Sequence, residues 1–118
     1  MKACEIYNNA LALLGYSENN GNAHLTNRVM NRAIPTFNLV YGDLRRICGY
    51  DIKRIKELSE DIELPDNAIE VLECGIASYI AMSEGDDSAQ AIWSAEYQAR
   101  RTLLSKIEEI QDTIPTVE

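Results

Sequence analysis

The stretch LPDNAIEVLECGIASYIAMSEGDDSAQAIWSAEYQARR, residues 64–101, decides the fold of this chain. Its pattern predicts two helices joined by a very short turn. The first begins at Pro65 or Asp66 and ends at Gly85, and three side chains can cap the second: Asp86, Asp87 and Ser88. Small residues would let another helix approach the first one closely, namely Ala68, Gly75, Ala77, Ser78 and Ala81. We expect an antiparallel hairpin on which the rest of the chain packs.

The second helix of this hairpin is expected to continue to about Gln111, because apolar residues recur along it at helical spacing. If Asp87 is its N-cap, Gln90 completes a capping box. Trp93 and Tyr97 lie one helical turn apart. We expect them to pack against the preceding helix, and a binding hot spot is the alternative.

Two helical patterns precede the hairpin. Apolar residues at i, i+3, i+4 and i+7 predict a helix over residues 3–14, which Gly15 can end. A longer pattern starts with Thr26 as N-cap and can end at Gly49. Pro35 should kink this second helix, because proline cannot donate to the carbonyl four residues back; two shorter helices are the alternative.

Residues 50–64 have a weaker pattern and predict a connector with some local structure. Taken together, the segments predict an all-α single domain of about four helices over residues 1–111. A flexible C-terminal tail is expected over residues 112–118, since Thr and Pro residues interrupt the helical pattern there.

The composition is ordinary for a soluble globular domain, with 46% hydrophobic and 25% charged residues among 118. No apolar run approaches the roughly 20 residues that span a bilayer. Polar residues interrupt any N-terminal signal sequence, so we expect a chain that is cytoplasmic when made and has no membrane contact. The 19 acidic and 11 basic residues give a net charge of −8, which disfavours wrapping of nucleic acid.

Residues that could perform chemistry are sparse. His24 could join the three cysteines in a zinc site, but the ligands lack the close spacing of such sites: Cys4, Cys48 and Cys74. Small buried cysteines are the expected alternative. No calcium-loop, zinc-protease or phosphate-loop motif is present. We therefore expect no catalytic residue, no cofactor and no metal.

Charge is segregated in the middle of the chain. Basic residues come first, at Arg45, Arg46, Lys53, Arg54 and Lys56, and an acidic run follows, at Glu57, Glu60, Asp61, Glu63, Asp66, Glu70 and Glu73. Such polarity suits head-to-tail contact between identical subunits, which closes into a ring when the rotation permits. The alternative is that the two blocks pair within one monomer or are solvated.

Several segments resemble the small head–tail connector, or adaptor, proteins of tailed bacteriophages and prophages. The resemblance covers most of the chain and rests mainly on packing residues. The shared motifs are an ALxLLG opening (Ala10–Gly15), Asn-x-x-Tyr-x-Asp-Leu (Asn38–Leu44), Leu64-Pro65, Gly75-Ile76-Ala77, and Tyr97 with Arg101.

This resemblance implies a non-enzymatic virion protein, located in the phage neck and in the host bacterial cytoplasm during assembly. Such connectors form a ring beneath the portal protein and extend the DNA channel toward the tail. The implied partners are other copies of the chain, the portal protein and the next neck or head-closure component, while DNA passes without specific binding. The net charge of −8 fits such a channel.

From charge segregation and tail composition, we expect the subunit interface to contain Arg45, Arg46, Arg54, Glu60, Asp61 and Glu63. We expect the tail to contact the portal or another partner through Asp112, Ile114 and Val117. The alternative function is a small helical regulator that binds protein or DNA. Its only candidate recognition helix is RRICGYDIKRIK, residues 45–56.

Overall fold

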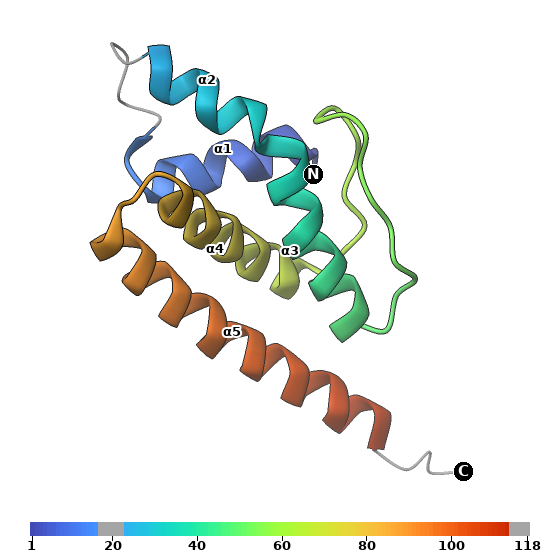
Figure 1. Cartoon of the computed structure of the whole chain (residues 1–118). Helices are drawn as coiled ribbons and strands as arrows, with labels where there is room; N and C mark the ends of the chain where they lie inside the picture. The colour runs from blue at the N-terminus through green and yellow to red at the C-terminus, as the bar shows by residue number, and fades with distance from the viewer. Residues whose placement is uncertain (17–22, 114–118) are drawn as a thin grey trace.

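The computed structural model describes residues 1–16 and 23–113; within these, the side chains of 23–26 and 108–113 are not described. The described residues form a single all-α domain (Figure 1), as the sequence predicts. Its helices are α1 (Ala3–Leu13), α2 (Ala23–Asn31), α3 (Ala33–Ile47), α4 (Asp66–Ser83) and α5 (Asp87–Thr113).

Helix α4 is the centre of the domain. It packs against α1 and α3 on one side and against α5 on the other (Figure 1). Gly75 is the point of closest approach, because a Cβ atom there would lie 2.6 Å from Cγ1 of Val40 and 2.8 Å from Cε1 of Tyr97. Ala68, Ala77 and Ala81 of α4 are also fully buried. The small residues therefore bring neighbouring helices close, and the antiparallel α4–α5 hairpin is confirmed.

The second predicted helix is two helices, which was the alternative expectation. Helix α2 ends at Asn31 and α3 begins at Ala33. Pro35 has no N–H to donate to the carbonyl of Asn31, so the chain breaks there and Pro35 lies in the first turn of α3, where its missing donor costs nothing. The predicted N-cap at Thr26 is wrong, because α2 begins at Ala23 and includes Thr26.

The turn between α4 and α5 is as short as predicted, but its cap differs. Gly85 has a φ of +70°, and the amides of Gly85 and Asp86 donate to the carbonyls of Met82 and Ala81 at 3.2 and 2.9 Å. This pairing is a Schellman motif. It places Asp86 directly before α5, where its Oδ1 accepts from the amide of Ala89 at 3.3 Å. The capping box predicted for Asp87 with Gln90 is therefore wrong.

The connector between α3 and α4 is an extended loop that runs along α3 and returns (Figure 1). Its carbonyls at Glu60 and Leu58 accept from the amides of Ala3 and Cys4 at 2.9 and 2.8 Å. The first amides of a helix have no partner within it, so the connector caps α1. Ile55 and Ile62 anchor the loop in the core.

Polar contacts join α1 to α2, and α2 to the hairpin. The Tyr7 hydroxyl on α1 donates to the carbonyl of Val29 on α2, and burial raises the pKa of Tyr7 to about 12. Arg28 on α2 donates to both oxygens of Glu84 at the end of α4, with a shortest distance of 2.7 Å. This ion pair holds the pKa of Glu84 below its usual value.

Helix α5 extends to Thr113, two residues beyond the predicted end at Gln111. Asp112, expected at the start of the tail, therefore belongs to the helix. Ile114 and Val117 lie outside the described residues. Within the described part of the chain, no helix combines the length and apolar content needed to cross a membrane.

Candidate assembly surface

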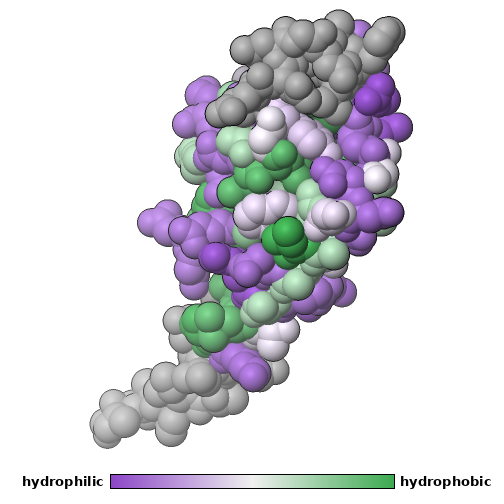
Figure 2. Space-filling view, turned by 90° about the vertical axis from the view of Figure 1, so that its left-hand side faces the viewer, coloured by the Kyte–Doolittle hydropathy of each residue, from purple (hydrophilic) through white to green (hydrophobic). Residues whose placement is uncertain are grey.

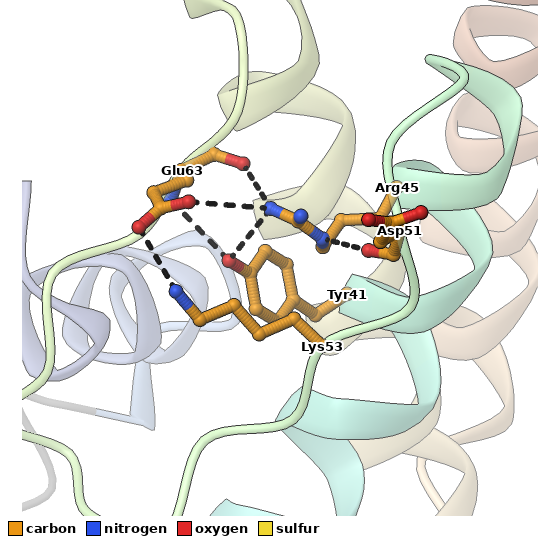
Figure 3. A network of polar contacts seen from close by, with 5 residues as sticks. All are labelled: Tyr41, Arg45, Asp51, Lys53 and Glu63. Atoms are coloured by element: carbon orange, nitrogen blue, oxygen red, sulfur yellow. Dashed lines mark hydrogen bonds and ion pairs between the residues drawn. The ribbon is translucent and has the colours of Figure 1, made fainter.

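Arg45 is at the centre of a polar network between α3 and the connector (Figure 3). Its Nε donates to the carbonyl of Asp51 at 2.6 Å, and its Nη1 donates to the carbonyl of Glu63 at 2.9 Å and to the hydroxyl of Tyr41 at 3.4 Å. The guanidinium also lies over the rings of Tyr41 and Tyr50, 5.6 and 5.2 Å from their centroids. One arginine thus holds both arms of the connector against α3: the outgoing arm, which leaves α3 and contains Asp51, and the returning arm, which leads to α4 and contains Glu63.

Two further contacts close this network. Lys53 on the outgoing arm pairs with Glu63 on the returning arm at 2.9 Å, and the Glu63 amide donates to the Tyr41 hydroxyl at 3.3 Å. The pair raises the pKa of Lys53 and lowers that of Glu63. The backbone N–H and C=O groups of an extended loop need hydrogen-bond partners outside the loop. Here the side chains of Tyr41 and Arg45 on α3 provide such partners.

This network corrects the predicted role of Arg45. Arg45 is buried, with 6% exposure, and its partners lie in the same chain, so it is not available to another subunit. The Nη1 of Arg45 lies 3.9 Å from Glu63 Oε2, in addition to the Lys53–Glu63 pair. The basic and acidic blocks therefore pair in part within the monomer, which was the alternative expectation.

Asp43 organises a second cluster, between α3 and α5. Its carboxylate accepts two hydrogen bonds from Arg101, at 2.7 and 3.0 Å, and one from the hydroxyl of Tyr97 at 2.8 Å. Arg46 adds a bond of 2.6 Å on the outer side. These donors, Arg101 first, hold the pKa of Asp43 well below its usual value. Burial, reinforced by the bond to the Asp43 carboxylate, raises the pKa of Tyr97.

The other residues expected at the interface lie on the outside of the connector. Arg54 is exposed and makes no ion pair with the described residues. Glu60 accepts from the amides of Lys56 and Glu57, so its carboxylate shapes the tip of the loop. Asp61 is exposed, and its backbone forms an isolated bridge with Lys2.

An open groove of about 510 Å³ lies between α3 and the outgoing arm of the connector. We call it the α3 groove. Its α3 wall consists of Pro35, Asn38, Leu39, Gly42, Asp43 and Arg46, and its other wall of Ile52 and Arg54. Leu39 and Ile52 are 57% and 72% exposed. Apolar side chains that face solvent beside arginines are typical of a binding surface.

The outer face of α5, opposite α4, lacks charge between Asp87 and Lys106. We call it the α5 outer face; at helical spacing it contains Ser88, Ala91, Ile92, Ala95, Ala99, Thr102 and Leu103. All are exposed, and Ile92 and Leu103 are 59% and 61% exposed. Figure 2, which looks at the end of the domain where α4 turns into α5, likewise has apolar side chains at the surface among polar ones. Helix faces in contact with water usually carry charged residues, so this face suits contact with another protein.

The other sites weighed from the sequence receive no support from the described residues. Among the described residues, no group of three or more His, Cys, Asp or Glu side chains is placed to hold a metal. Cys48 and Cys74 are buried, as small core cysteines would be, and the side chain of His24 is not described. The candidate recognition helix at residues 45–56 is wrong, because α3 ends at Ile47 and residues 50–55 are not helical.

Sequence reasoning missed the roles of Asn38 and Asp43. The Asn38 side chain accepts from the amide of Ile55 at 2.7 Å and donates to its carbonyl at 3.0 Å, as a neighbouring strand would. Asp43 accepts hydrogen bonds from both Tyr97 and Arg101. The i, i+4 spacing of these two residues places two donors on one face of α5. That spacing was the available signal for an acidic partner, although it could not indicate which acid.

No protein-family model, curated protein or solved structure matches the chain. The resemblance to phage head–tail connectors therefore stays a prediction that rests on the quoted motifs and on the contacts their residues make.

Proposed function

We propose that this protein is a structural adaptor of a phage neck, which forms a ring under the portal and extends the DNA channel toward the tail. One observation carries the proposal. The motif residues on which the resemblance to phage connectors rests, although far apart in sequence, hold neighbouring segments together. Asp43, Gly75, Tyr97 and Arg101 make one connected set of contacts between α3, α4 and α5. Asn38 and Tyr41 bind the loop between α3 and α4, at Ile55 and Glu63. The resemblance thus concerns the residues that hold α3, α4, α5 and the connector together.

The surface properties support the same proposal. A ring subunit must present two different faces to its neighbours, and the chain has two distinct candidate faces, the α5 outer face and the α3 groove. The net charge of −8 suits a channel, because an acidic wall repels the phosphate backbone and lets DNA slide. In this proposal the protein is not an enzyme and acts through its surfaces.

The proposal is tested by removing the gene from the phage or prophage that encodes the chain. Filled heads and finished tails should accumulate separately, because the joint between them is missing, and the wild-type chain supplied from a plasmid should restore joined particles. Normal yields of intact virions without the chain would contradict the proposal. Heads that fail to package any DNA would contradict it as well, since a neck adaptor acts after packaging.

A further inference from the structure

We propose that the α3 groove of one copy binds the segment Ile114–Glu118 of a second copy. This inference rests on the proposed function, because it names a contact through which copies would join in a ring. Binding of the segment can nevertheless be measured without portal protein, so the two ideas can fail separately.

The groove offers two kinds of contact. Leu39 and Ile52 supply exposed apolar surface on opposite walls. Arg54 makes no ion pair with the described residues, and Arg46, although paired with Asp43, keeps most of its side chain in solvent. A ligand for this groove should therefore combine apolar side chains with negative charge.

The sequence after α5 has this composition. The segment Ile114–Glu118 contains the acidic Glu118 and no basic residue, and three more acidic residues precede it in the last turns of α5: Glu108, Glu109 and Asp112. Ile114 and Val117 provide two apolar side chains three residues apart. Pro115 restricts the residue before it to extended conformations, which suits a segment lying along a groove. In a chain of net charge −8, the arginines of the groove are an attractive place for this acidic segment.

Geometry favours a second copy over the same chain. The Arg101–Asp43 contact fixes α5 beside the groove, and α5 then continues to Thr113, about 18 Å further along its axis. It extends past the end of α3 (Figure 1). The five residues from Ile114 to Glu118 span at most about 17 Å when extended. Returning to the groove of their own chain would take the whole length of these residues and leave none to lie in the groove. The same residues can enter the groove of a neighbouring copy.

The contact is heterologous, because groove and segment are different surfaces. Each copy has one of each, so the arrangement can repeat around a ring. A short peptide buries far less than the roughly 1,200 Å² of a stable interface, so its affinity alone should be weak, with a Kd of about 0.1–1 mM. The α5 outer face would add to it in the assembled ring.

The test is an NMR titration of the ¹⁵N-labelled full chain with a synthetic peptide of residues 111–118. Amide signals of Leu39, Gly42, Ile52 and Arg54 should shift together and saturate. Arg54→Glu should weaken binding about tenfold, because it replaces an attraction with a repulsion. Lys56→Glu, an equal charge change in the same arm but outside the groove, should have a much smaller effect. A peptide with serine at both Ile114 and Val117 should bind at least tenfold more weakly.

Three results would overturn the inference. The first is no shift at millimolar peptide. The second is shifts that map away from the groove, or that survive Arg54→Glu unchanged. The third result concerns binding within one chain. The full chain with both Ile114→Ser and Val117→Ser is compared with the unmutated chain at low and at high protein concentration. If the groove signals of the two proteins differ equally at both concentrations, the segment occupies the groove of its own chain. Concentration-dependent shifts of the unmutated chain, lost in that variant, are the expected result.

Discussion

The hydroxyl of Tyr97 on α5 donates a hydrogen bond of 2.8 Å to Oδ2 of Asp43 on α3, although 54 residues separate the two. Arg101, one turn further along α5, binds both oxygens of the same carboxylate. The ring of Tyr97 meanwhile packs against Gly75 of α4. Tyr97 therefore lies where α3, α4 and α5 meet, and its contacts fix the register of all three helices.

Asp43→Asn should lower the free energy of unfolding by about 2–3 kcal/mol, because charged hydrogen bonds to Arg101 become neutral ones and one acceptor becomes a donor. Urea denaturation followed by circular dichroism measures the change. Asp51→Asn is the matched control: only the backbone carbonyl of Asp51 enters the Arg45 network, so its effect should stay within about 0.5 kcal/mol. Equal effects of both substitutions would contradict the assigned role of Asp43.

The same carboxylate should make stability depend on pH. The pKa of Asp43 in the folded protein lies below its ordinary value of 3.8. The ionised carboxylate therefore stabilises the fold fully above about pH 3.8, and this stabilisation is lost as the pH falls below 3.8 toward the pKa of the folded state. The difference in unfolding free energy between the wild type and Asp43→Asn should be constant from pH 7 to about 5 and shrink below about pH 4. A difference that stays constant down to pH 3 would show that the pKa of Asp43 is not lowered.

Alanine substitutions at two glycines should change the stability of the fold in opposite directions. At Gly75 the new Cβ would meet Val40 and Tyr97, so Gly75→Ala should destabilise the fold by about 1–3 kcal/mol through overpacking. At Gly42, also helical, a Cβ would meet nothing within 4 Å, and Gly42→Ala should stabilise α3 by up to about 1 kcal/mol. Thermal melts of the two variants decide the matter, and a stabilised Gly75→Ala protein would contradict the close packing of three helices.

Arg45→Met should loosen the connector, because the carbonyls of Asp51 and Glu63 lose their donor. We expect a loss of about 2–4 kcal/mol and faster amide hydrogen exchange in the part of the connector that Arg45 holds. Arg54→Met is the control, since Arg54 is exposed and makes no ion pair with the described residues. Unchanged exchange in Arg45→Met would mean that the connector is held by other contacts.

Ala95→Arg tests the α5 outer face as a surface between copies. Ala95 is exposed, so the free energy of unfolding should change by less than about 0.5 kcal/mol. Assembly on the portal should be blocked, because a long charged side chain would enter a close helix contact. Gln98→Arg adds the same charge on the flank of α5 and should leave assembly intact. Co-sedimentation with portal protein measures both, and normal assembly of Ala95→Arg would remove this face from the proposal.

Much of the fold could be predicted from the sequence because its signals are local. The hairpin, its glycine turn and the start of α4 after Pro65 follow from helical spacing and capping residues. The N-cap residue of α5 does not follow from the sequence. A Schellman motif and a capping box are both compatible with residues 85–90, and only the backbone geometry decides which residue caps the helix. The sequence does not decide whether the second helix bends or splits, since proline is compatible with either a kink or a new first turn.

The candidate surface was harder to predict, because charge in a sequence does not reveal burial. Arg45 and Arg46 are neighbours with the same charge, yet the first is enclosed by the connector and the second faces solvent. The connector has no period that would place Asp51 and Glu63 on opposite sides of one arginine. Its conformation depends on contacts between residues distant in sequence, which a pattern within one segment cannot contain.

The central proposal, that this chain is a ring-forming neck adaptor, is tested most directly by mixing it with purified portal protein encoded in the same genome and measuring the mass of any complex. Native mass spectrometry or light scattering should give a complex in which many copies of the chain join one portal oligomer, with a fixed ratio that does not change with excess chain. Portal and chain that remain separate at every ratio, or a single copy bound per portal oligomer, would contradict the claim.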